Sequence, residues 1–290
     1  MTIAVGEKLP EVTLMQLTDK GPAPVKTSEL FGGKKVVVFA LPGAFTPTCS
    51  NQHLPGFIEK AADIKAKGVD TIACLSVNDA FVMGAWGKQQ GAGDAVLMLG
   101  DGNGDAGGIS GHRPDKSSYA RTYLKGGPSM TIAVGEKLPE VTLMQLTDKG
   151  PAPVKTSELF GGKKVVVFAL PGAFTPTCSN QHLPGFIEKA ADIKAKGVDT
   201  IACLSVNDAF VMGAWGKQQG AGDAVLMLGD GNGDFAAKTG LDFDGSGFGM
   251  GRRSQRYSMI VEDGVVKQLN VEPNPGEAKV SGADTILSQL

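Results

Sequence analysis

One stretch of this sequence occurs twice, and that repeat constrains every interpretation of the chain. Residues 1–105 recur as residues 130–234 without a single difference. Solenoid repeats are shorter and they diverge, so a stack of repeats is excluded. Only the second copy continues further, to the end of the chain. We therefore predict a truncated copy at 1–105, a linker at 106–129 with Gly, Ser and Pro at its ends, and one complete domain at 130–290.

Charge and composition exclude several classes of partner. The formal net charge is −2, so no basic surplus favours nucleic acid or an anionic membrane. The apolar runs are far shorter than a membrane span, and the first residues lack the basic start and apolar core of a signal peptide. The four cysteines are two positions present twice, which does not suggest a disulfide scaffold. A reducing, cytoplasmic setting is expected.

The second copy alternates apolar strands with helical patterns. The β-branched run at 164–170 predicts a buried strand, and a hairpin is predicted around Asp263-Gly264. Further strands are expected at 198–206 and 224–228, and helices at 186–193, from Asn207-Asp208 through Trp215, at 235–239, and after Ser281 as a cap. This order predicts a thioredoxin-like α/β fold, a central mixed sheet flanked by helices.

The truncated copy lacks the segment that would supply the last two strands. Its strand at 35–41 is therefore expected to keep an unpaired apolar edge, which invites pairing with another chain. An alternative is that 1–105 competes with 130–234 for the single C-terminal segment, because loop-closure entropy grows slowly with length.

Cys178 lies between a predicted strand and a predicted helix, in the segment PGAFTPTC. A cysteine at a helix N-terminus is favoured as thiolate by the unpaired backbone N–H groups there, and a thiolate is the nucleophile. Thr175 can offer a hydroxyl to the same place, and Thr175 or Thr177 is expected to cap the helix. Pro171 limits access of water. The alternative is a packed, inert cysteine.

PGAFTPTC resembles the peroxiredoxin signature Pro-x-x-x-Thr-x-x-Cys, in the form found in the peroxiredoxin-5 (type II) subfamily. Four further segments resemble that subfamily in order and spacing, namely HLPGFIEK from His182, CLSVNDAFV from Cys203, GRRSQRYSM from Gly251 and NVEP from Asn270. The resemblance covers all of 130–290 and, truncated, 1–105.

The resemblance implies a role for each residue of the site. Cys178 would be the peroxidatic cysteine, Thr175 would hydrogen-bond the thiolate and the peroxide, and Pro171 would shield the sulfur. Arg256 would be the active-site arginine, whose fixed donors orient the peroxide and stabilise charge on the leaving oxygen. The product on the protein would be a sulfenic acid.

The first copy and the resolving step depart from the family pattern. Pro42, Thr46 and Cys49 form at best a second, partial site, because 1–105 contains no counterpart of Arg256. No cysteine follows Cys203, so a one-cysteine mechanism is expected, with glutathione, glutaredoxin or thioredoxin as the external reductant. Cys203 is the internal alternative as resolving cysteine, although its apolar strand favours a buried small hydrophobe.

We thus predict a thiol peroxidase for hydrogen peroxide and alkyl hydroperoxides, with no cofactor and no metal. Three histidines give no metal set, and the calcium-like loop from Asp242 places Arg253 where a bidentate Glu is required. Relatives of this kind often form homodimers, which is an expectation here as well. The rival hypotheses are a redox-sensing thiol protein that relays oxidation to a partner, and a fusion that the partial copy inactivates.

Overall fold

The computed structural model describes residues 3–107 and 131–290, which divide into two compact units. Unit 1 consists of the described residues up to 107 together with Asp244–Gly251, and unit 2 consists of the described remainder. The predicted boundaries at 105 and 130 stay predictions, and the predicted linker lies outside the described residues from 108 onward. No described helix is long and apolar enough to cross a membrane.

Unit 2 contains a seven-stranded mixed sheet in the order β14-β13-β8-β9-β10-β6-β7. Its three central strands β8, β9 and β10 are parallel, and β13 and β6 flank them in antiparallel orientation. The strands are β6 (Thr142–Thr147), β7 (Gly150–Lys155), β8 (Lys164–Ala169), β9 (Thr200–Ser205), β10 (Leu226–Gly229), β13 (Tyr257–Glu262) and β14 (Val265–Val271). The thioredoxin-like sheet of the prediction is confirmed.

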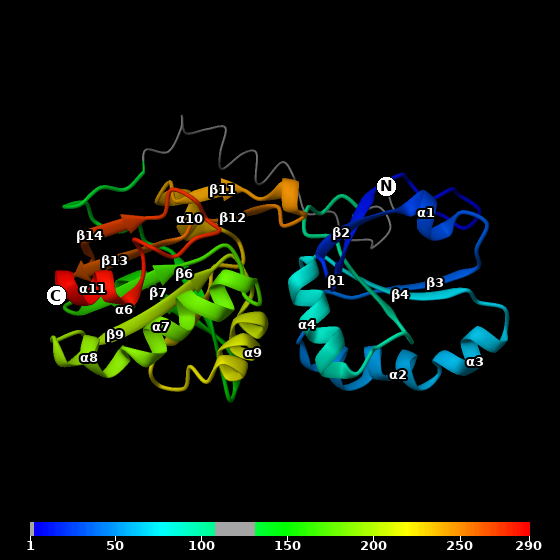
Figure 1. The fold of residues 1–290 in the computed structure, drawn as a ribbon, viewed down its shortest axis with the longest axis horizontal. Coiled ribbons are helices and arrows are strands. Elements are labelled where there is room, and N and C mark those ends of the chain that lie inside the picture. The colour runs from blue at the N-terminus through cyan, green and yellow to red at the C-terminus, as the bar shows by residue number, and fades with distance from the viewer. Residues whose placement is uncertain (1–2, 108–130) are drawn as a thin grey trace. The chain divides into compact units, whose positions relative to one another are not determined.

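Helices α7, α8 and α9 lie along one face of this sheet, and the ribbon β11–β12 lies with α10 on the other (Figure 1). The helices of unit 2 are α6 (Thr156–Phe160), the π-helix η2 (Cys178–His182), α7 (Leu183–Glu188), α8 (Ala190–Ala195), α9 (Ala209–Gln219), α10 (Asp234–Lys238) and α11 (Ala283–Gln289). The ribbon consists of β11 (Asp242–Asp244) and β12 (Arg252–Ser254), and the 3-10 turn η3 (Ser246–Phe248) lies between its strands.

Unit 1 repeats this arrangement without the C-terminal strands. Its five-stranded sheet has the order β2-β1-β5-β4-β3, so β3 is an edge strand, as predicted. The strands are β1 (Thr13–Thr18), β2 (Gly21–Lys26), β3 (Val36–Ala40), β4 (Thr71–Ser76) and β5 (Leu97–Gly100), and the helices are α1 (Thr27–Phe31), η1 (Cys49–His53), α2 (Leu54–Glu59), α3 (Ala61–Ala66) and α4 (Ala80–Gln90).

The C-terminal hairpin, β13 and β14, pairs with the second copy. Six residues of β13 align with β8, from Tyr257 opposite Ala169 to Glu262 opposite Lys164. Val165, Val166 and Val167 are consequently fully buried. Of the two alternatives for the single C-terminal segment, the structure shows its packing on 130–234.

Helix α9 shows how the sequence fixes the packing of helix on sheet. The helix begins where the sequence predicted, and Asp208 caps it by accepting a hydrogen bond from the Val211 N–H. Gly220 ends it in the left-handed conformation at φ 71°. A Cβ added to Gly213 would lie 2.5 Å from Leu146, so only glycine permits this close approach to β6.

Candidate active site

Cys178 is the first residue of η2 and is fully buried. The loop before it is held by Ala173, whose N–H donates to Asn207 Oδ1 at 3.0 Å. Phe174 in this loop has φ 65°, a conformation that bulky residues seldom adopt and that the surrounding structure must enforce. Trp215 donates to Ser179 Oγ at 3.0 Å and fixes the residue next to the cysteine. The sulfur is therefore set on a rigid turn.

The expected threonine cap is wrong. No side chain caps η2, whose N-cap residue Thr177 already has helical φ and ψ. The Thr175 hydroxyl instead donates to the Gly172 carbonyl at 2.9 Å, and the Thr177 hydroxyl donates to the Gly276 carbonyl at 2.7 Å. η2 is a π-helix, in which the Leu183 N–H donates to the Cys178 carbonyl five residues earlier. Pro184, the next residue, has no N–H to donate to the carbonyl four residues earlier.

Arg256 contacts the sulfur of Cys178 directly. Its Nη2 donates to Cys178 Sγ at 3.2 Å, its Nη1 contacts His182 Nδ1 at 3.1 Å, and its Nε donates to the Pro275 carbonyl at 3.0 Å. The side chain is 2% exposed. All three sides of the guanidinium are thus engaged, so one fixed N–H pair is directed at Cys178, where it stabilises negative charge.

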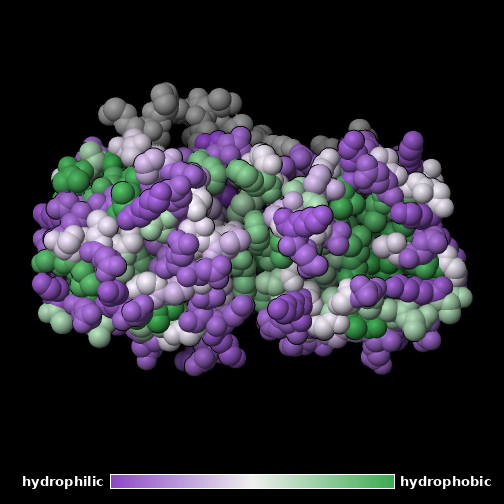
Figure 2. All heavy atoms as spheres, viewed as in Figure 1, coloured by the Kyte–Doolittle hydropathy of each residue, from purple (hydrophilic) through white to green (hydrophobic). Residues whose placement is uncertain are grey.

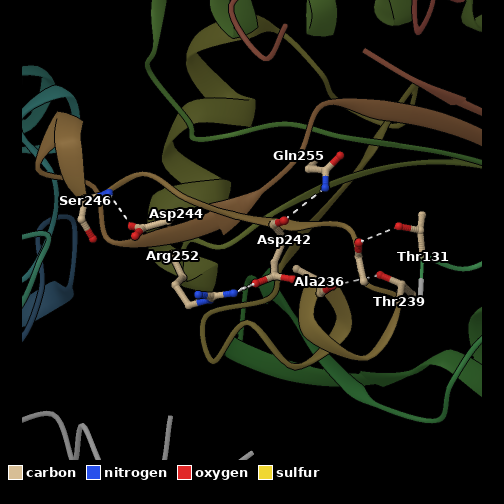
Figure 3. A network of polar contacts seen from close by, with 9 residues as sticks. Thr131, Ala236, Thr239, Asp242, Asp244, Ser246, Arg252 and Gln255 are labelled. Carbon is tan, nitrogen blue, oxygen red and sulfur yellow. Dashed lines mark hydrogen bonds and ion pairs between the residues drawn. The ribbon is translucent and has the colours of Figure 1, made fainter. Parts of the chain in front are cut away.

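Arg256 lies shortly after β12, and polar contacts within the ribbon β11–β12 hold the residues that precede it in place (Figure 3). Arg252 Nε donates to Asp242 Oδ2 at 2.9 Å, and Gln255 Nε2 donates to the Asp242 carbonyl at 3.1 Å. The backbone N–H of Gln255 also donates to the Leu241 carbonyl at 2.7 Å. The residue before Arg256 is therefore tied at both backbone and side chain.

His182 is neutral, and the arginine decides its tautomer. Arginine has no acceptor, so Nδ1 must accept from Arg256 and Nε2 must carry the proton that reaches the Ser281 carbonyl at 3.0 Å. Burial, and next the charge of Arg256, lower the pKa of His182 to about 3, against the opposing hydrogen bond to Ser281. The structure therefore places His182 in the site, beside the guanidinium of Arg256.

Glu272 and Ser281 complete the network, and the sequence interpretation missed both. Glu272 Oε1 accepts from the Ser281 hydroxyl at 2.9 Å and from the backbone N–H groups of Val280 and Ser281. Ser281 does not cap α11, whose N-cap is Gly282, so that expectation is wrong. A Glu between Val271 and Pro273 at the end of a predicted strand was the available signal.

The first copy keeps the loop but not the partners. Thr46 donates to the Gly43 carbonyl at 2.9 Å, and Cys49 is buried. Pro42 is exposed, whereas Pro171 is buried. No arginine occurs in residues 1–105, so the sulfur of Cys49 meets no guanidinium from its own copy.

Cys203 lies in the middle of β9, between Phe168 of β8 and Met227 of β10 in register. Burial, and next the nearby Cys178, raise the pKa of its thiol well above the usual range. Such a thiol is a weak nucleophile at neutral pH. Within residues 3–107 and 131–290, no group of three or more His, Cys, Asp or Glu side chains could hold a metal ion.

A thioredoxin-like sheet that presents a cysteine to a buried arginine is the arrangement of a thiol-dependent oxidoreductase. The redoxin family matches residues 4–123 and 133–287. The chain is 48% identical over 179 residues to Peroxiredoxin-2E, chloroplastic, of Arabidopsis thaliana, an alignment that covers 60% of this chain and 76% of that protein. It is 47% identical over 163 residues to Hybrid peroxiredoxin hyPrx5 of Haemophilus influenzae, covering 56% and 67%.

The crystal structure of reduced Prx3 from Vibrio vulnificus in complex with hydrogen peroxide is 57% identical, with a TM-score of 0.53, and the match covers 55% of this chain and 99% of that one. This chain belongs to the redoxin family and, within it, to the peroxiredoxins, which are thiol peroxidases.

The lowered pKa of His182 predicts a loss of stability in acid. Between the unfolded pKa near 6.5 and the folded value of about 3, the unfolded chain binds one more proton. The free energy of unfolding of unit 2 therefore falls as pH decreases through this window, by about 2 kcal/mol from pH 6.5 to 5. The measurement is urea unfolding followed by Trp215 fluorescence in a Trp86→Phe background, with and without His182→Gln.

Asp230 also makes the free energy of unfolding depend on pH, so the readout is the difference in that free energy between the parent and His182→Gln. Burial raises the pKa of Asp230 to about 6, so its contribution to stability is present below its unfolded pKa near 3.8 and is lost as pH rises through 6. Asp230 is common to both proteins and cancels in the comparison. His53→Gln in unit 1 is the matched control. A parallel pH dependence for the parent and His182→Gln would contradict the assignment.

Proposed function

We propose that this chain is a one-cysteine peroxidase of the peroxiredoxin-5 type that reduces hydrogen peroxide and small alkyl hydroperoxides at Cys178. The observation that carries the proposal is the 3.2 Å hydrogen bond from Arg256 Nη2 to Cys178 Sγ. The full burial of the sulfur favours small substrates. The similarity to hyPrx5 supports the subfamily, and the similarity to a peroxide-bound Prx3 supports the substrate.

In the proposed reaction the Cys178 thiolate attacks one oxygen of the peroxide, an S–O bond forms and the O–O bond breaks. The sulfur is oxidised to a sulfenic acid, and the leaving alkoxide or hydroxide takes up a proton. The N–H groups of Arg256 stabilise the charge that develops on the leaving oxygen, and His182 holds the guanidinium in place without competing for a proton. Pro171 and Thr175 are both buried beside the cysteine and would exclude water.

Regeneration is proposed to use external thiols. One thiol condenses with the sulfenic acid to a mixed disulfide and water, and a second thiol releases Cys178 and leaves as the disulfide. Glutathione, glutaredoxin or thioredoxin would supply these thiols, in a reducing compartment such as the cytoplasm. The buried position of Cys203 supports an external reductant. The redox-relay alternative has no supporting observation in the described residues or among the relatives.

The one-cysteine mechanism predicts that Cys203→Ser retains peroxide turnover with glutathione and glutaredoxin within about twofold of the parent. The reason is that a thiol of raised pKa in the core neither attacks the sulfenic acid nor leaves readily. Turnover and the mass of the oxidised protein after one equivalent of peroxide are the measurements. An intramolecular Cys178–Cys203 disulfide that forms at the rate of turnover would refute the one-cysteine mechanism and leave the peroxidase activity intact.

A further inference from the structure

The truncation leaves the outer edge of β3 without a neighbouring strand. In unit 1, β3 pairs with β4 on one side only. In unit 2 the equivalent strand β8 is covered on its other side by β13. No strand lies beside the outer edge of β3 in the part of the chain that the structure describes.

The direction of the backbone groups along β3 can be derived from its two ends. The Leu41 N–H donates to the Leu75 carbonyl at 3.1 Å, and the Lys35 carbonyl accepts from Asp70 at 2.8 Å. The groups of successive residues in a strand point to alternate sides. Those of Val37 and Phe39 therefore face β4, whereas those of Val36, Val38 and Ala40 face outward. The edge presents three N–H groups and three carbonyls for pairing.

The side chains of this edge are apolar and incompletely covered. Val36, Val37 and Val38 are half-buried, whereas their equivalents Val165, Val166 and Val167 are fully buried. Figure 2 shows hydrophobic residues at the surface of unit 1 in the region of β3 and β4. Covering them would remove apolar surface from water, which favours association.

The opposite edge of the same sheet is protected. Strand β2 has the sequence GPAPVK, and Pro22 and Pro24 remove two of its N–H groups. Both prolines lie within a continuous antiparallel ladder with β1, and such a ladder accepts a residue without an N–H only where the backbone groups face away from the partner strand. The missing donors are therefore those of the outward side. Prolines on an edge strand prevent further pairing. β3 carries neither proline nor charge, and Lys34 and Lys35 directly precede it.

The C-terminal hairpin cannot close every edge. Each chain has one such hairpin, which unit 2 holds, and two copies of the strand that accepts it. If two chains exchanged hairpins, one acceptor strand per chain would still be open. Pairing of one β3 with the β3 of another chain closes both open edges, so it is the arrangement with a net gain in hydrogen bonds and buried area.

We propose that two copies of this chain associate through antiparallel pairing of β3 with β3, about a two-fold axis at Val38. In this register Val38 lies opposite Val38, and Val36 lies opposite Ala40. All outward N–H and carbonyl groups of both strands then find partners. Lys35 falls opposite Leu41 of the second copy, so like charges do not meet. The contact is isologous, and it closes at two chains.

The test is sedimentation velocity of the full chain over a range of concentrations, which does not depend on peroxidase activity. The parent should sediment as two associated chains, whereas Val38→Pro should sediment as a single chain. The dissociation constant of the variant should be more than about tenfold higher than that of the parent. Proline removes an N–H that faces away from β4, so the ladder within unit 1 is retained. Val38→Ala is the matched control, because it shortens the same side chain but keeps the N–H, and it should still associate.

A second variant guards against misfolding of unit 1. Val38→Lys places two like charges opposite each other and should also abolish association, while Trp86 fluorescence in a Trp215→Phe background reports whether unit 1 is folded. A parent at the mass of a single chain at all concentrations overturns the proposal. So does equal association of all variants. A cross-link between a Lys35→Cys chain and a Glu262→Cys chain also overturns the proposal, because it would place β13 of one chain on the β3 edge of the other. In unit 2 the equivalent residue of Lys35 is Lys164, whose Nζ lies 3.1 Å from Glu262 Oε1.

Discussion

Replacing Cys178 with serine is expected to lower peroxide consumption by more than about 1000-fold, because the sulfur is the nucleophile of the proposed reaction. A hydroxyl at this position would lie in the same hydrogen bond to Arg256, so the fold of unit 2 should be retained. The measurement is the initial rate of hydrogen peroxide loss with dithiothreitol as reductant. It compares the parent with Cys178→Ser at equal concentration.

The chain contains its own matched control. Cys49 lies in a segment of identical sequence and begins the equivalent π-helix η1, but its copy contains no arginine. Cys49→Ser should therefore keep nearly all of the parental rate. Equal losses in the two variants would mean that both copies turn over peroxide, and an inactive parent would contradict the proposed function.

Arg256→Lys is expected to lower the rate of peroxide reduction by about 100- to 1000-fold, the usual effect of removing a preorganised donor. A lysine ammonium cannot donate to Cys178, His182 and the Pro275 carbonyl in the fixed planar directions of a guanidinium. The reaction of Cys178 with iodoacetamide should slow as well, because the hydrogen bond that stabilises negative charge on the sulfur is lost.

Arg252→Lys is the control for this substitution. Arg252 lies four residues earlier, is partly exposed and forms an ion pair with Asp242 that lysine can retain. Its variant should remain within about threefold of the parent. If Arg252→Lys and Arg256→Lys lose activity equally, the ribbon and not the contact with Cys178 would be responsible.

Local patterns predicted the elements that carry the cysteine. The β-branched run that became β8, the capped helix α9 and the hairpin around Asp263-Gly264 were all expected from sequence. Strands β6 and β7 were not predicted. The two prolines of β7 count against a strand in local rules, although edge strands tolerate them. The helix expected at 186–193 is split between α7 and α8 at Lys189.

The polar partners of the site were beyond local reasoning. Arg256 is 78 residues from Cys178, and Ser281 is 99 residues from His182. Only the family resemblance pointed to the arginine. The predicted threonine and serine caps were wrong because local rules assign a hydroxyl to the nearest helix. In the folded chain the Thr177 hydroxyl donates to the Gly276 carbonyl and the Ser281 hydroxyl donates to Glu272.

The duplication, the strand-loop-helix position of Cys178 and the missing arginine of the first copy can be read from residue order and local propensity. The copy that holds the C-terminal hairpin, the direction of the guanidinium toward the sulfur and the neutral state of His182 emerge only in the folded chain. Burial and hydrogen-bond partners distant in sequence exist only after the sheet has assembled, and they set both orientation and protonation.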